Sequence, residues 1–418
     1  MKSPNITIAT FVGFTNRGAE ALLRSRVSSI KKYIPGATFN VLTIYRDSCQ
    51  PIDDVVYIQT FGGQREKLRS LRYLLSSACN CFIWTLEALR YRFVGKTSHQ
   101  VIKKLASSDL FISCDGDVLG EDYGLFPYLW RLYYLSIGFL LKKPVVIYAE
   151  GVGPFHSGIA KLLSRWFFNK CVYLSVRDEL SYGYLKKLGI NKKVDVVSDS
   201  AFLLNSSNDP APDYKQRGEK LIGLAVSKLV TQYGFKYGNN TDSYRAFLQL
   251  MSEVVDWMIT NLDATVVLIP HVVQIKRDDF ETARDILDLV KNKRSVEIVN
   301  KSLNASQLKS VISNCDLIIA SRMHAAIAGL ASFVPVVGIA YSHKMYGVLA
   351  NSGIDTVVDI KHLDWNITAV IDETLKNSPK IKKRLGESIP EMMKLAEIPA
   401  KRVAEILQSR LSPFLYGT

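Results

Sequence analysis

Residues 317–326 read Leu-Ile-Ile-Ala-Ser-Arg-Met-His-Ala-Ala, and this stretch indicates the fold of the chain. The apolar run 317–320 is typical of a buried parallel strand, and the residues after it favour a helix. Arg322 and His324 therefore stand where a strand passes into a helix N-terminus, which offers unpaired N–H groups to an anion. We expect Arg322 to hold an anion and His324 to carry a proton. The alternative is that Arg322 bonds a carbonyl and His324 is a satisfied core histidine.

The same alternation of strand and helix recurs along the chain. Short runs rich in Val and Ile alternate with longer amphipathic stretches, which predicts βα units and parallel sheets. The expected strands span 6–11, 38–44, 55–59, 110–114, 145–149, 172–176, 194–197, 221–226, 265–269, 296–299, 317–320 and 336–340. The predicted fold class is α/β, with two doubly wound Rossmann-like domains and an interdomain cleft.

The length of 418 residues exceeds what one core usually covers, so we expect two domains. We assign residues 1–204 to an N-terminal domain with a basic insertion at about 61–107, and residues 219–390 to a C-terminal domain. The polar, proline-containing stretch 205–218 predicts a linker. Residues 391–418 predict a C-terminal helix that packs back on the N-terminal domain.

Composition describes an ordinary globular chain, with 48% hydrophobic and 22% charged residues. The net charge of +14 favours acidic ligands, nucleic acid or an anionic membrane surface. The six cysteines lack paired C-x-x-C spacing, and we expect neither a metal site nor a signal peptide nor a membrane-spanning helix. We therefore expect a reduced, cytoplasmic chain. Its oligomeric state cannot be read from the sequence.

A glycine-containing turn follows the first expected strand and leads into a helix. We interpret it as a substrate loop whose binding residues are Gly13, Asn16, Arg17, Gly18 and Glu20. The turn lacks both the dinucleotide and the Walker glycine patterns, so a simple connection is the alternative.

Other strand ends also carry polar side chains. Asp115 and Asp117 stand close enough together for one carboxyl to serve in acid–base chemistry, with a helix cap or a solvated acidic turn as the alternative. Glu150 is expected to face substrate. Arg177 is a second candidate anion ligand, with a surface ion pair as the alternative, and His271 ends a strand of the second half.

Taken in order, these elements resemble the polysaccharide pyruvyl transferase family over roughly residues 8 to 355. The matching elements are Asn16-x-Gly18-Ala19-Glu20, Gly116-Asp117-x-Leu119-x-x-Asp122, Gly151-x-Gly153-Pro154, Val176-Arg177-Asp178 through Leu188-Gly189, Asp199-x-Ala201-Phe202, Ser321-Arg322-x-His324 and Tyr341-x-x-Lys344. The resemblance implies an architecture similar to GT-B glycosyltransferases. It also implies transfer of the enolpyruvyl carbons of phosphoenolpyruvate to a sugar as a cyclic ketal. Asp115 departs from the family, which more often has glycine there.

The resemblance also implies roles for the candidate residues. His324 transfers the proton, with His271 as its partner or as an acceptor ligand, and Asp117 orients or deprotonates a sugar hydroxyl. The residues expected to bind the donor are Ser321, Arg322, Met323, Arg177 and Lys344. Asp115, Glu150 and the glycine-containing turn are expected to bind substrate, and the turn is an alternative to Arg177 or Lys344 for holding the second anionic group of the donor. Phosphoenolpyruvate is a substrate in this scheme, and no cofactor is expected.

A long basic stretch separates the strands that end at residue 59 and begin at residue 110. Its cations are interleaved with leucine and aromatic residues, which fits a surface lying on anionic lipid at the inner face of a membrane, where a lipid-linked saccharide acceptor is found. A pair of ordinary basic helices is the alternative. We expect no nucleic acid partner, because no recognisable RNA- or DNA-binding module accompanies the charge.

Two other functions stay open at this point. One is a glycosyltransferase that uses a nucleotide-sugar donor on the same architecture, and the other is a non-catalytic saccharide-binding protein of that fold. The identity and linkage of the acceptor sugar are not readable, because acceptor contacts lie on loops without a known code.

Overall fold

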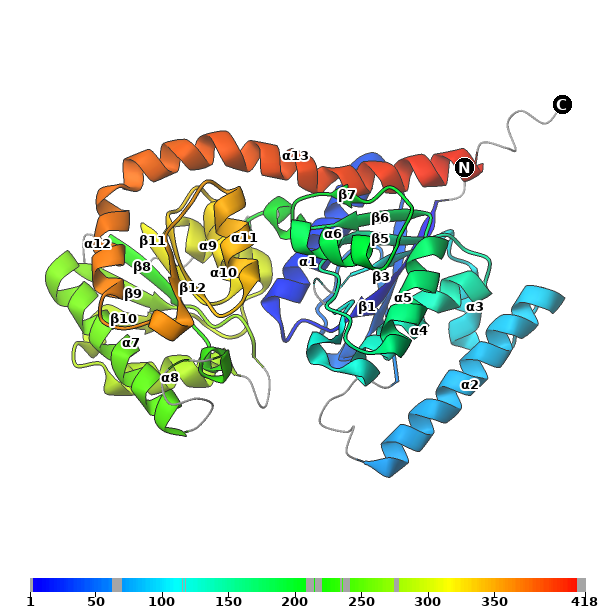
Figure 1. The fold of residues 1–418 in the computed structure, drawn as a ribbon, viewed down its shortest axis with the longest axis horizontal. Helices are drawn as coiled ribbons and strands as arrows, with labels where there is room; N and C mark the ends of the chain where they lie inside the picture. The colour runs from blue at the N-terminus through cyan, green and yellow to red at the C-terminus, as the bar shows by residue number, and fades with distance from the viewer. Residues whose placement is uncertain are drawn as a thin grey trace. The chain divides into compact units, whose positions relative to one another are not determined.

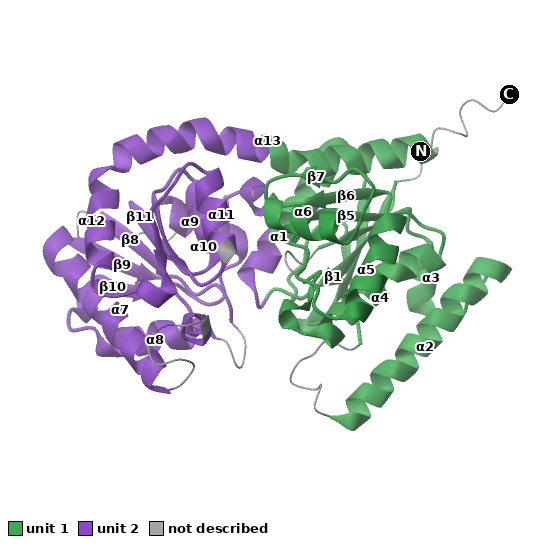
Figure 2. Ribbon diagram, viewed as in Figure 1, with its two compact units in different colours: residues 1–14, 22–200, 394–418 green, residues 15–21, 201–393 purple. Residues whose placement is uncertain are grey.

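The computed structural model describes residues 3–61, 70–114, 116, 118–207, 214, 220–233, 235, 241–273 and 278–411. The chain forms two compact units, shown in Figures 1 and 2. Unit 1 comprises residues 1–14, 22–200 and 394–418, and unit 2 comprises residues 15–21 and 201–393.

Unit 1 is built on a seven-stranded sheet in the order β3-β2-β1-β4-β5-β6-β7. Its strands are β1 (Asn5–Phe11), β2 (Thr38–Thr43), β3 (Val55–Gln59), β4 (Leu110–Ser113), β5 (Val145–Glu150), β6 (Tyr173–Val176) and β7 (Asp195–Val196). All neighbouring pairs are parallel. The strand order reverses between β1 and β4, which is the position where doubly wound sheets bind ligands.

The helices of unit 1 begin and end at recognisable signals. They are α1 (Arg17–Tyr33, whose first turn belongs to unit 2), α2 (Leu71–Val94), α3 (Gln100–Ala106), α4 (Leu125–Leu140), α5 (Gly158–Lys170) and α6 (Glu179–Lys187), with 3-10 turns at Arg46–Ser48 and Glu121–Tyr123. Ser70, Ser157 and Asp178 cap α2, α5 and α6 by accepting from backbone N–H groups. Gly95 ends α2 at φ +75°, a backbone conformation that favours glycine.

Unit 2 repeats the design with six parallel strands in the order β10-β9-β8-β11-β12-β13. The strands are β8 (Lys220–Ala225), β9 (Ala264–Leu268), β10 (Val296–Ile298), β11 (Leu317–Ala320), β12 (Val336–Ala340) and β13 (Val357–Asp359). The helices are α7 (Thr241–Leu262), α8 (Asp279–Leu289), α9 (Ala305–Ser313), α10 (Met323–Leu330), α11 (His343–Asn351), α12 (Ile367–Lys376) and α13 (Ser378–Leu411, in unit 1 from Lys394), with 3-10 turns at Ser200–Leu203, Lys228–Tyr233, Lys293–Ser295 and Ile360–His362. The strand order of unit 2 reverses between β8 and β11.

The predicted α/β class with two doubly wound domains is confirmed: each unit has helices around a buried sheet rich in Val, Ile and Leu. All twelve predicted strands are present, and each of their ends differs by no more than one residue. The sequence did not predict β13, a three-residue strand at the sheet edge whose residues are only half-buried. Most of the predicted linker 205–218 lies outside the described residues.

Candidate functional site

Ser321, Arg322 and His324 lie at the point where the strand order of unit 2 reverses. The backbone N–H of Ser321 donates to the carbonyl of Ala225 at 3.0 Å, which joins the carboxyl end of β11 to that of β8. Arg322 then takes an extended conformation as the N-cap residue of α10. The first turn of α10 therefore begins where the topology of an open α/β sheet favours a ligand.

Arg322 is held by a buried carboxylate. Its Nε donates to Asp279 Oδ2 at 2.9 Å, and its Nη2 donates to Asp279 Oδ1 at 2.7 Å. The Arg322 side chain keeps 13% of its exposure, whereas that of Asp279 keeps 1%. Asp279 therefore fixes the orientation of the guanidinium through Nε and Nη2, and the role of Arg322 as an anion holder stays a prediction. A paired, planar guanidinium is a well-oriented donor, but its charge is partly compensated.

Asp279 organises the site, although no sequence motif singles it out. It is the first residue of α8, and its Oδ2 also accepts from the backbone N–H groups of His271 (3.2 Å) and Val272 (2.9 Å). One carboxylate thus fixes both the loop after β9 and the side chain of Arg322. The only available sequence signal is a pair of acids, Asp278 and Asp279, before an apolar helical pattern, which by itself indicates a helix cap.

His271 is buried beside this ion pair. Burial lowers the pKa of its imidazole to about 4; the neighbouring His324 and Arg322 act in the same direction, while Asp279 opposes them. His271 is therefore neutral near pH 7. Its Nδ1 has no hydrogen-bond partner among the described residues, which is rare for a buried polar atom.

The glycine-containing turn of the sequence meets His324. A Cβ built on Gly18 would lie 2.2 Å from Nδ1 of His324, so only a glycine leaves room for the imidazole. Asn16 caps the helix α1 by accepting from the N–H of Gly18 at 2.9 Å, and the N–H of Arg17 donates to the carbonyl of His271 at 2.9 Å. The structure therefore brings Gly18, His271, Arg322 and His324 together within unit 2, from segments far apart in the sequence.

Arg17 and Glu20 pair with each other rather than standing open to a ligand. Nη1 of Arg17 lies 3.0 Å from Glu20 Oε2, and its Nη2 donates to the carbonyl of Lys301 at 2.8 Å. Glu20 is fully buried. These contacts correct the expectation that both residues bind substrate, because they use the two charges to fasten the first turn of α1 inside unit 2.

Three other predicted donor residues lie at the carboxyl ends of β11 and β12. Ser321 is buried, and its Oγ has no partner among the described residues. Met323 is the first residue of α10 and is half-buried. Lys344 lies in the first turn of α11, at the carboxyl end of β12, the strand next to β11. Ser321 Oγ and His271 Nδ1 are thus buried polar atoms to which a bound ligand could hydrogen-bond.

Two charged candidates in unit 1 are structural. Glu150 has no exposed surface and contacts the buried Arg26 at 2.6 Å, so the expectation that it faces substrate is wrong. Arg177 pairs with Asp199 at 2.7 Å, and both side chains are nearly inaccessible. This buried pair replaces the predicted alternative of a surface pair with a neighbouring acid, and it makes Arg177 a poor ligand for an incoming anion.

The remaining candidates are also in unit 1. Gly13 has φ +140°, and a Cβ there would lie 2.7 Å from Ser48 Oγ, so this glycine serves the packing of its own loop. Asp115 and Asp117 lie outside the described residues, and their predicted roles stay predictions.

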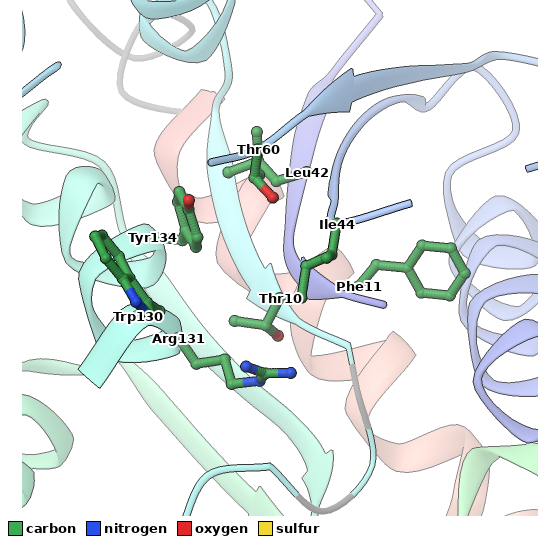
Figure 3. Close-up of a pocket in the computed structure, with 8 residues that line it drawn as sticks. All are labelled: Thr10, Phe11, Leu42, Ile44, Thr60, Trp130, Arg131 and Tyr134. Carbon is green, nitrogen blue, oxygen red and sulfur yellow. The ribbon is translucent and has the colours of Figure 1, made fainter. Parts of the chain in front are cut away.

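Unit 1 contains a pocket at the carboxyl ends of β1, β2 and β3, shown in Figure 3. It is lined by Thr10, Phe11, Leu42, Ile44, Thr60, Trp130, Arg131 and Tyr134. Thr60 Oγ1 already donates to the Thr43 carbonyl at 3.0 Å, and Arg131 Nη1 donates to the Pro127 carbonyl at 3.1 Å. None of the residues that the sequence singled out lines this pocket.

Two kinds of feature are absent from the part of the chain that the structure describes. Its His, Cys, Asp and Glu side chains nowhere form a group of three or more that could hold a metal ion. None of its helices combines the length and apolar character needed to cross a membrane.

Comparisons with known proteins identify the fold and the family of the chain. The amylovoran biosynthesis protein AmsJ of Erwinia amylovora is 24% identical over 94% of this chain and 97% of its own length. Two solved structures share the GT-B-like two-domain fold. One is a UDP-GlcNAc 2-epimerase from Neisseria meningitidis, with a TM-score of 0.59 and 12% identity over 97% of this chain and 100% of that chain. The other is the calicheamicin glycosyltransferase CalG4, with a TM-score of 0.51 and 13% identity over 99% of this chain and 100% of that chain. The family model for polysaccharide pyruvyl transferases matches residues 16–343. The chain therefore belongs to the polysaccharide pyruvyl transferase family.

Proposed function

We propose that this protein transfers the enolpyruvyl carbons of phosphoenolpyruvate to a saccharide, free or lipid-linked, as a cyclic pyruvate ketal during synthesis of a cell-surface polysaccharide. The observation that carries the proposal is the convergence of Arg322, His324 and His271 at the switch point of unit 2, in a chain of this family. The similarity to an amylovoran biosynthesis protein supports the polysaccharide context.

The reaction sets three demands on the site. A proton must reach the methylene carbon of the donor, and a sugar hydroxyl must attack the adjacent carbon and lose its own proton. A second hydroxyl then attacks the same carbon and loses its proton, while the carbon–oxygen bond to phosphate breaks. The donor becomes the methyl-bearing ketal, and inorganic phosphate leaves. The site therefore needs an anion holder, a proton donor and a proton acceptor.

Arg322 and the start of α10 supply the anion holder. Asp279 fixes the guanidinium through two hydrogen bonds, so the donor meets a group whose orientation is already set. The first N–H groups of α10 lack intrahelical acceptors and add partial positive charge beside it. The Ser321 hydroxyl, which has no hydrogen-bond partner among the described residues, donates to the anion when it binds at this turn.

His324 and His271 divide the proton transfers. His324 stands beside the backbone of Gly18 and donates the proton to the methylene carbon. His271 is neutral near pH 7 because burial lowers its pKa to about 4, so it accepts a hydrogen bond or a proton rather than donating one as an acid. Asp117 remains the predicted group for orienting the sugar hydroxyl.

Ligand-induced stabilisation tests the donor assignment without knowledge of the acceptor. Phosphoenolpyruvate is expected to raise the melting temperature of the protein, and uridine or cytidine nucleotides are expected to leave it unchanged. The shift should be lost in Arg322→Ala, while the matched variant Arg384→Ala, an exposed arginine of α13 that bonds the Gly353 carbonyl, should retain it. Stabilisation by nucleotides alone would favour a nucleotide-sugar glycosyltransferase.

A further inference from the structure

The helix α2 carries two apolar stripes on opposite sides. Ser77, Trp84 and Ala88 are buried. The centre of the Trp84 ring lies 6.1 Å from that of the Tyr134 ring on α4. Eight large apolar side chains of α2 are exposed, and four of them, Leu75, Phe82, Leu86 and Phe93, follow one another along a single stripe. Leu75, Phe82 and Leu86 each stand two positions before a buried residue, which is about 200° around a helix. The exposed stripe therefore points away from the protein, with Phe82 at 64% and Phe93 at 80% exposure.

The helix α5 shows the same feature. Ala160, Ser164, Phe167 and Phe168 are buried. Ile159, Leu162 and Trp166 follow helical spacing on another face and are exposed, Leu162 to 69%. Large apolar side chains in such a row are unusual on a protein surface and indicate a partner.

Both α2 and α5 contact α4. Nη1 of Arg92 on α2 donates to the carbonyl of Phe139 on α4 at 3.5 Å, and the Phe139 ring lies 5.9 Å from the ring of Trp166 on α5. Figure 1 shows α2 at the edge of unit 1, with α4 and α5 beside it in the same unit. Both helices thus pack on α4, and we call their exposed apolar residues together the α2–α5 surface.

The charges on these helices identify the partner. The two helices carry one acidic residue, Glu87, and six basic residues: Arg72, Arg90, Arg92, Lys161, Arg165 and Lys170. Glu87 already accepts a hydrogen bond from Thr97 at 2.5 Å. A second copy of the chain would bring cations against cations, whereas anionic lipid headgroups complement them. Lys170 lies 4.4 Å from the centre of the Trp166 ring, so cation and apolar group share one end of the surface.

We propose that the α2–α5 surface docks on an anionic phospholipid bilayer, with the exposed stripes inserted at the headgroup level and the cations paired to lipid phosphates. Such a helix lies in the interface and does not span the membrane. The inference is independent of the donor chemistry, because it rests on unit 1 alone.

Vesicle co-sedimentation of the full chain tests the proposal. Binding is expected to vesicles of phosphatidylethanolamine and phosphatidylglycerol, to be much weaker to phosphatidylcholine alone, and to fall as salt is raised. The double variant Phe82→Ser with Phe93→Ser should lose binding by about tenfold or more. The control Leu289→Ser removes an exposed apolar side chain from α8 and should bind as the parent does.

A charge variant separates lipid from protein partners. Lys161→Glu with Arg165→Glu should abolish binding to anionic vesicles, while Lys382→Glu with Lys383→Glu on α13 should not. We expect all variants to fold, because every changed side chain is exposed. Thermal melts check this. Equal vesicle binding by the stripe variants and their controls would overturn the proposal. So would a parent protein that binds no vesicles and instead forms a dimer, if the Phe82/Phe93 double variant is monomeric.

Discussion

Asp279 and Arg322 form a two-point ion pair across 43 residues of sequence, with contacts of 2.9 and 2.7 Å. The same carboxylate accepts from two backbone N–H groups of the loop after β9. The orientation of the guanidinium is therefore tied to the position of that loop. This coupling explains why a residue with no place in the sequence motifs is central to the site.

The ion pair gives the first prediction. Asp279→Asn keeps the shape of the side chain but removes the charge and half of its accepting capacity, so Arg322 loses its fixed orientation. We expect phosphate release from phosphoenolpyruvate to fall on the order of 10- to 100-fold, the range seen when groups that orient a site are removed. Asp278→Asn is the control: Asp278 caps the same helix, asparagine caps equally well, and activity should persist.

The contact between Gly18 and His324 gives the second prediction. In Gly18→Ala the new methyl group must displace the imidazole, since a Cβ at this position would overlap Nδ1 of His324. We expect activity to be lost while the melting temperature changes little, because alanine favours the helix by about 1 kcal/mol and offsets part of the crowding. Gly183→Ala in α6, where a Cβ meets nothing within 4 Å, should stabilise the protein and leave turnover unchanged. Similar turnover in both variants would contradict a catalytic place for His324.

The buried His271 gives a prediction for pH. Its pKa is lowered from 6.5 to about 4 in the folded protein, so the unfolded chain binds more protons between these values. The free energy of unfolding should therefore fall as the pH drops from about 6.5 to 4, by about 3 kcal/mol for this group. Urea unfolding at several pH values measures the effect. His271→Gln should flatten this part of the profile, and His362→Gln, at an exposed position, should not.

The pair Arg26–Glu150 predicts a stability effect rather than a change in catalysis. Glu150→Gln leaves the Arg26 guanidinium buried without its counter-charge, which should cost about 3–5 kcal/mol of unfolding free energy. Asp54→Asn breaks the exposed pair with Lys31 and should cost less than about 1 kcal/mol. If Glu150→Gln reduced turnover with no loss of stability, Glu150 would belong to the reaction after all.

The fold is readable from the sequence because its signals are local. Runs such as 317–320 and 336–340 are apolar on both faces, so strand and burial follow from a few adjacent residues. The turn with Arg322 and His324 is likewise predicted correctly at a strand end and helix start. β13 lacks this signal, because its three residues are half-buried.

The partners of the charged residues are not readable, because they depend on contacts between distant segments. Glu150 and Arg177 stand at strand ends in the same way as Arg322, yet their contacts with Arg26 and Asp199 make them structural. Local sequence cannot distinguish a strand-end charge that meets solvent from one that meets a buried counter-charge. The contact of Gly18 with His324 is equally invisible, since it joins α1 to α10.

The most direct test of the account is stoichiometry. The protein is incubated with phosphoenolpyruvate and detergent-extracted lipid-linked saccharides from its source cells, released phosphate is measured, and the saccharide is analysed by mass spectrometry. We predict one pyruvate ketal for each phosphate released in the parent protein, and neither product in Arg322→Ala or His324→Ala. Ketal formation that persists in both variants would contradict the proposed site, and consumption of nucleotide sugar without any use of phosphoenolpyruvate would contradict the proposed function.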